Sequence, residues 1–349
     1  MLLANTQELM QRKLDQQAFD TYAVLVSISG QKKMFFSKNA NGDTLFDIAS
    51  CGKILHTAPL ILQAADENKL SLDSTLADFF DNVPEDKKPV TIKHLLTHTS
   101  GIIRIPLPKE ICAQGIDATA EYIMANPLAY PIGSNYIYSC NGMILLGYIL
   151  EKLYGTTLDV LFEERLKKPL GMTRSCFQIA VDEPNAAVCY TRRDVGALRF
   201  DDANVLSMGR VGGSGGSFFS LNDIYKYAKA VMSKSEVLFS SSFHDLSEIN
   251  YTPDYSEGRG LGYLVVDEAY PQTGELFPIG SFGHCGHTGQ SMFFNRELDL
   301  YVVILSNATR FSAMKQNFVH DDYETVMAMR AEIHNEIKRD LIAEGFLSR

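Results

Sequence analysis

Strand-like segments lie at both ends of this chain, and helical patterns fill the long stretch between them. Residues 22–29 and 33–36 are rich in β-branched and aromatic side chains, and Ser29-Gly30-Gln31 separates them as the turn of a hairpin. Strands from both ends can pair in one sheet, which leaves the middle of the chain as a helical insertion. The later strand patterns are 261–266, 291–294 and 300–306.

Apolar residues recur at helical spacing through the middle of the chain, and Gly and Pro separate the segments. Amphipathic patterns at the N-terminus and at 321–343 predict two further helices. Pro59 is expected to kink the first of the middle helices or to end its first part. The middle helices are expected at 54–65, 92–97, 116–124, 143–154, 158–166 and 221–232.

These patterns predict an α+β fold in which a mostly antiparallel sheet, flanked by helices, carries an inserted and mainly helical lobe. We expect residues 1–60 and 235–349 to form the α/β lobe with the sheet, and residues 61–234 to form the helical lobe. Ligands often bind at such boundaries, so an active site is expected between the lobes. Residues 235–259 are polar and lack periodicity, which predicts a long mobile loop.

The charge of the chain argues against two classes of partner. Lys and Arg number 32 against 42 Asp and Glu, and the net charge of -10 disfavours binding to nucleic acid and to an anionic membrane. Apolar runs such as 143–150 fall short of the roughly 18 residues that span a bilayer. A cytoplasmic protein is expected, because charged residues stand where a signal peptide would be apolar: Glu8, Arg12, Lys13 and Asp15.

Ser50 and Lys53 form the first candidate motif. A serine at a helix start with a lysine three residues later puts the ammonium beside the hydroxyl on one helix face. The same spacing occurs at 29–32 and 312–315, but only Ser50 opens a long apolar helix. The alternative for Ser50 is a plain helix N-cap.

Two further motifs follow along the chain. Tyr138 lies at a loop-to-helix junction and can act as a general base if a nearby cation stabilises its anion; the alternative is simple packing. Residues 283–289 read Gly-His-Cys-Gly-His-Thr-Gly, where glycines let the backbone approach a ligand. The alternatives are a tight glycine-rich turn or a metal site, and the spacing of ligands disfavours the metal. We expect no metal and no organic cofactor.

In their order and separation, the three motifs resemble those of the serine hydrolase family of class C β-lactamases, penicillin-binding peptidases and related esterases. Residues 90–102, 202–223 and 298–307 resemble further segments of that family. The resemblance therefore covers residues 22 to 307. It implies a β-lactamase/transpeptidase-like fold and catalysis through an acyl-enzyme.

The resemblance also implies a role for each motif residue. Ser50 would be the nucleophile, Lys53 the cation beside it and Tyr138 the general base, with His284 as the catalytic side chain of the third motif. The backbone N–H groups of Ser50 and His287 would form the oxyanion hole, where losing one donor costs about 3 kcal/mol in other hydrolases. The other positions implied to bind substrate are Cys140, Cys285 and Gly286.

Two positions depart from the β-lactamase motifs. Cys140 stands where the lactamases have an Asn that contacts the substrate amide, and Asn141 follows one position late. His284 stands where they have a Lys that favours a substrate carboxylate. A thiol is a poor hydrogen-bonding group and His is largely neutral at pH 7, so both anchors for a β-lactam are weakened.

The departures predict an esterase that acts on small ester substrates, with small amides also possible substrates. Three alternatives stay open: a D-amino-acid-type peptidase or amidase, a weak β-lactamase, and a non-catalytic ligand-binding module on the same fold.

Three of the six cysteines, Cys51, Cys140 and Cys285, lie inside the motifs. All six are expected to be free thiols, because their spacing shows no disulfide framework. One interpretation makes the motif cysteines small buried fillers. The other makes Cys140 an accessible thiol that Lys53 and a helix N-terminus activate.

Overall fold

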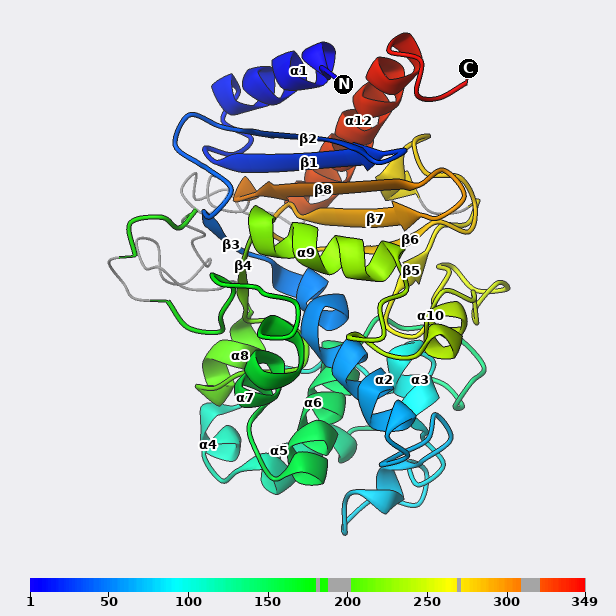
Figure 1. Ribbon diagram of the computed structural model, residues 1–349. Coiled ribbons are helices and arrows are strands. Elements are labelled where there is room, and N and C mark those ends of the chain that lie inside the picture. Colours follow the sequence, from blue (N-terminus) through cyan, green and yellow to red (C-terminus); the bar gives the residue numbers. More distant parts are fainter. Residues whose placement is uncertain (180–182, 188–201, 269–270, 309–320, 349) are drawn as a thin grey trace.

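Strands from both ends of the chain form one sheet in the computed structural model, which describes residues 1–179, 183–187, 202–268, 271–308 and 321–348. The strands are β1 (Tyr22–Ile28), β2 (Gln31–Phe36), β5 (Leu264–Val265), β6 (Phe282–Cys285), β7 (Ser291–Asn295) and β8 (Leu300–Ser306). Their order is β2-β1-β8-β7-β6-β5, and every neighbouring pair is antiparallel (Figure 1). The predicted α+β fold with an antiparallel sheet is therefore confirmed.

β1 is buried along its whole length because both faces of the sheet are covered. Val24 and Val26 belong to the core shared with α1 (Ala4–Asp15) and α12 (Asp321–Ala343). Ala23 and Leu25 point to the opposite face and join the larger core. On that face α9 (Leu221–Met232) packs against β1 and β8 (Figure 1).

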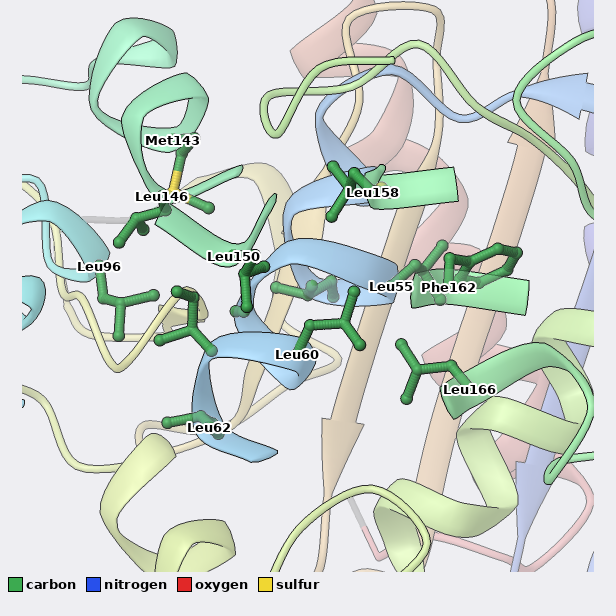
Figure 2. Packing of buried hydrophobic residues seen from close by; sticks show 14 of the residues in the cluster. Leu55, Leu60, Leu62, Leu96, Met143, Leu146, Leu150, Leu158, Phe162 and Leu166 are labelled. Carbon is green, nitrogen blue, oxygen red and sulfur yellow. The ribbon is translucent and has the colours of Figure 1, made fainter. Parts of the chain in front are cut away.

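Helices fill the region beyond that face of the sheet. α2 (Ala58–Asp66) runs from the sheet into this region, and leucines on it and on the preceding turn pack against α6 (Cys140–Tyr154) and α7 (Leu158–Phe162) (Figure 2). A small second sheet pairs β3 (Leu45–Asp47) with β4 (Phe218–Ser220). The described residues also contain the α-helices α3 (Ile92–Leu96), α4 (Lys109–Cys112), α5 (Ile116–Met124), α8 (Ala203–Met208) and α10 (Ser241–Ser247).

Several expected boundaries moved for local reasons. α6 begins at Cys140 and not at Met143, because Ser139 caps it by accepting the N–H of Gly142. The helix expected at 54–65 is divided where Pro59 was expected to end its first part: Pro59 lies in the first turn of α2, where a missing N–H is tolerated. A π-helical turn, Lys53–Thr57, precedes it.

Two larger expectations also changed. The strand expected at 261–266 shortens to the two residues of β5. The loop expected at 235–259 contains α10, so it is not a continuous loop. The lobe boundaries at 60 and 234 stay predictions. Across the described ranges, no helix is long and apolar enough to cross a membrane.

Candidate active site

The first two predicted motifs meet at the hydroxyl of Ser50. Ser50 lies in a 3-10 turn, Ala49–Cys51, directly after β3, and Lys53 opens the π-helical turn that follows. Ser50 Oγ is 3.0 Å from Lys53 Nζ and 2.7 Å from the phenol oxygen of Tyr138, which lies just before α6. The N-cap of the serine's turn is Ile48, so Ser50 is not a plain helix cap.

Lys53 is completely buried and reaches three oxygen or sulfur atoms. Its Nζ donates to Ser50 and to the carbonyl oxygen of Ser214 (2.7 Å), and it lies 3.7 Å from Cys140 Sγ. Asp202 holds Ser214 in turn by accepting from its hydroxyl (2.9 Å). Burial lowers the pKa of Lys53, and the Asp202 carboxylate acts in the opposite direction. The lysine therefore donates to the Ser50 oxygen from a buried position.

The third motif lies beside the nucleophile turn. The Cys51 thiol donates to the carbonyl oxygen of His284 on β6 (3.6 Å). A Cβ on Gly286 would stand 2.7 Å from the carbonyl oxygen of Ile48, so glycine permits the close approach of the two turns. Ser50 and His287 consequently lie on adjoining turns. Their assignment as oxyanion-hole residues stays a prediction.

His284 is buried and neutral. Its Nδ1 donates to the carbonyl oxygen of Cys285 (2.7 Å), which leaves Nε2 as an acceptor facing Arg259 Nη1 at 3.4 Å. Burial, followed by the charges of Arg259 and Lys53, lowers the pKa of His284 well below its usual range. His284 therefore does not supply the positive charge of the lactamase lysine.

Arg259 brings a positive charge into the site, and none of the three sequence motifs contains this residue. The guanidinium carbon lies 5.3 Å from the centre of the Tyr138 ring. The side chain is buried, donates to the Tyr136 hydroxyl (2.9 Å) and forms an ion pair with Glu257. The only signal in the sequence is a single Arg between two glycines, inside the segment expected to be a loop.

Neither residue at the second motif replaces the lactamase asparagine. Cys140 is 8% exposed, and its sulfur faces Lys53. Asn141 is buried: its amide nitrogen donates to the carbonyl oxygen of Ile105 (3.2 Å), and its amide oxygen accepts from Asn204 (3.1 Å). The expected weakening of this substrate anchor agrees with this geometry.

Of the two other Ser-x-x-Lys serines, only Ser29 can be located. Ser29 lies in the turn between β1 and β2, and Ser312 and Cys189 lie outside the described residues. Cys51, Cys112, Cys140 and Cys176 are free thiols, and burial raises the pKa of the Cys51 thiol. Within the part of the chain that the structure describes, no three His, Cys, Asp or Glu side chains gather as a metal site.

Comparison with known proteins shows the family. The family model described as Beta-lactamase matches residues 6–322. A protein of Escherichia coli (strain K12) named "Putative D-alanyl-D-alanine carboxypeptidase" is 30% identical over 314 residues, which cover 77% of this chain and 70% of that protein.

Solved structures agree in fold. A class C β-lactamase in complex with cefoxitin matches with a TM-score of 0.72 at 20% identity, over 95% of this chain and 98% of the other. EstCE1, a hydrolase with promiscuous acyltransferase activity, matches with a TM-score of 0.73 at 20% identity, over 94% and 98%. The chain has the β-lactamase/transpeptidase-like fold, belongs to the β-lactamase family and is a serine hydrolase.

Proposed function

We propose that the chain hydrolyses small esters through an acyl-enzyme formed on Ser50. The observation that carries the proposal is the position of Ser50 Oγ, within hydrogen-bonding distance of both Lys53 Nζ and the Tyr138 phenol oxygen. A serine hydroxyl needs a neighbouring base to become a nucleophile, and both neighbours can move a proton.

In the first half of the reaction, Ser50 Oγ bonds to the ester carbonyl carbon while its proton passes to the Tyr138 oxygen. The tetrahedral intermediate then breaks its bond to the alcohol oxygen, which takes the proton from Tyr138. In the second half, a water molecule gives a proton to Tyr138 and attacks the acyl carbon. Ser50 leaves and regains its proton, and the acid product is released.

The cations around Tyr138 support its role as the base. Lys53 Nζ lies 5.0 Å and the Arg259 guanidinium carbon 5.3 Å from the centre of its ring. Positive charge at this distance stabilises the phenolate that accepts the proton.

We propose esters, and not β-lactams or peptides, because of the residues at the two substrate-anchoring positions. Cys140 and the neutral His284 occupy the positions of the lactamase Asn and Lys, and the charge of Arg259 is already paired with Glu257. The site therefore offers little that would hold a β-lactam or a peptide carboxylate. EstCE1, named as a hydrolase with acyltransferase activity, is one of the matching folds.

A second candidate is removal of a C-terminal D-amino acid from a peptide. Two observations favour it: a guanidinium lies beside His284, and the curated relatives carry the carboxypeptidase name. If Arg259 exchanges Glu257 for a substrate carboxylate, the missing anchor is restored.

Covalent labelling tests the nucleophile. We expect a fluorophosphonate to label Ser50 alone, and Ser50→Ala to lose both labelling and ester hydrolysis while its circular dichroism is unchanged. Ser29→Ala is the matched control, because Ser29 shares the Ser-x-x-Lys spacing but lies in a turn. Label on Ser29, or hydrolysis that survives Ser50→Ala, would contradict the proposal.

Initial rates on four substrates distinguish the two candidates. They are a short-chain aryl ester, a penicillin, a peptide ending in D-Ala-D-Ala and the same peptide with an amidated end. We expect kcat/KM for the ester to exceed the other three values by at least about 100-fold. Comparable rates on the ester and the free-acid peptide, with loss on the amidated one, would replace the esterase by the peptidase.

A further inference from the structure

His98 contacts the chain on both sides of Tyr138. The N–H of Ile137, the residue before the tyrosine, donates to the carbonyl oxygen of His98 (3.0 Å). The N–H of Ser139, the residue after it, donates to His98 Nδ1 (3.3 Å). The imidazole also lies against the phenol itself, with ring centres 4.8 Å apart. One residue thus touches three consecutive positions of the second motif.

The backbone of His98 adopts a conformation that most residues avoid. His98 follows the end of α3 with φ 57°, in the left-handed region. Such a backbone costs a residue with a side chain about 1–2 kcal/mol, and residues of this kind gather at functional sites. Its carbonyl oxygen also accepts from the Tyr130 hydroxyl (3.3 Å). Tyr130, in the loop that leads to Tyr138, therefore helps to hold His98 in this strained conformation.

The ring must stay neutral to do this. Nδ1 accepts a backbone N–H, so it cannot carry a proton, and the hydrogen of the imidazole is on Nε2. His98 is 1% exposed, and the charged groups that face it are Arg259 and Lys53, with His284 close by. These surroundings disfavour an imidazolium and so preserve the bond to Ser139.

We propose that His98 is a positioning residue for the general base: its carbonyl oxygen and Nδ1 hold residues 137 and 139 so that the Tyr138 oxygen stays 2.7 Å from Ser50 Oγ. This inference rests on the proposed role of Tyr138. The segment 136–139 belongs to no helix or strand, so its backbone needs contacts from outside to be held in place.

Substitutions of His98 can distinguish the hydrogen-bond acceptor at Nδ1 from the bulk of the imidazole ring, and the first two remove the acceptor. His98→Gly removes the ring and relaxes the left-handed backbone, and His98→Leu keeps bulk without an acceptor. Both should lower kcat for ester hydrolysis by about 100-fold with KM within about threefold, because a displacement of about 1 Å at a reacting group has such effects. Both should also slow fluorophosphonate labelling of Ser50.

His98→Asn should rescue the enzyme. Its amide oxygen takes nearly the place of Nδ1, and Asn tolerates the left-handed region. We expect His98→Asn to keep kcat within about tenfold of the wild type. His94→Asn is the control, since His94 lies in α3 but bonds to Thr91 at the start of that helix. Its kcat should match the wild type.

Tyr138→Phe shows whether Tyr138 is the general base, and so distinguishes a failure of the proposed function from a failure of the proposed role of His98. If Tyr138→Phe is inactive while His98→Gly and His98→Leu keep kcat within about threefold of the wild type, the positioning role is wrong and the proposed function stands. If His98→Asn loses as much as His98→Leu, the acceptor is not what matters, and the inference is again overturned. If Tyr138→Phe keeps its activity, the general base of the proposed function is wrong, and this inference falls with it.

Discussion

At position 284, a neighbouring residue decides which side chain the third motif can hold. His284 Nε2 lies 3.4 Å from the Arg259 guanidinium, and neutral His accepts a hydrogen bond from it. A Lys at 284 would put a second cation at that place. We expect His284→Lys to lower the free energy of unfolding by about 2 kcal/mol, because like charges in contact inside a protein repel strongly.

A double-mutant cycle checks this reason. Arg259→Gln removes the competing charge and frees Glu257 to pair with the new lysine. The double variant His284→Lys with Arg259→Gln should therefore be more stable than the sum of the two single effects, by about 1 kcal/mol or more in urea unfolding. Additive effects would show that the two side chains do not interact.

Cys140 has two interpretations: a small buried filler, or an accessible thiol that Lys53 activates. At 8% exposure it is enclosed, which favours the buried-filler interpretation despite the nearby Lys53. We expect iodoacetamide at neutral pH to modify Cys112, which is partly exposed, before Cys140, and the enzyme to keep its activity. Peptide mapping by mass spectrometry measures both sites. Inactivation that Cys140→Ser prevents would restore the reactive interpretation.

At the scale of elements, the loop before β4 crosses α6 closely enough that glycine is required. A Cβ on Gly213 would collide with the carbonyl oxygen of Met143 in α6. The next residue, Ser214, provides the carbonyl oxygen that Lys53 binds. Gly213→Ala should therefore shift this carbonyl, lower the melting temperature and reduce kcat.

Gly142 is a matched control, because it lies on α6, the helix that the Gly213 loop crosses. Its Cβ would make ordinary contacts, the nearest at 3.5 Å with Leu95, and it lies inside α6. Gly142→Ala should raise the free energy of unfolding by about 0.5–1 kcal/mol through helix propensity. Thermal unfolding and ester turnover of the two variants measure the contrast. If Gly213→Ala behaves like Gly142→Ala, the loop does not depend on this close approach.

Elements fixed by local pattern could be predicted from the sequence. The bounds of α5, α9 and α12 match the expected ranges, because apolar spacing decides which face is buried. The spacing of Ser50 and Lys53 indicated that these two side chains are neighbours, and the family resemblance implied that Tyr138 joins them. Arg259 and the role of His98 could not be predicted, because both depend on contacts between distant segments. No periodicity or local motif marks such contacts.

At the scale of the whole molecule, buried histidines make stability depend on pH. Burial lowers the pKa of His56 to about 3 and that of His334 to about 4, whereas a histidine in the unfolded chain titrates near 6.5. Below pH 6.5 these histidines are protonated in the unfolded chain but stay neutral in the folded protein. The free energy of unfolding therefore falls as the pH is lowered, by about 1.4 kcal/mol per pH unit for each such histidine, until its folded pKa is reached.

His334 allows this dependence to be measured at one residue. His334 lies on α12 and is fully buried against the sheet, where its Nε2 is 3.3 Å from Ser291 Oγ on β7. His334→Gln has no proton to bind, so between pH 6 and pH 4.5 its free energy of unfolding should fall less steeply than that of the wild type, by about 1 kcal/mol per pH unit. His94→Gln should change the slope less, because His94 is only half buried. Urea unfolding at four pH values measures the slopes. Equal slopes for His334→Gln and the wild type would mean that His334 takes up its proton without unfolding.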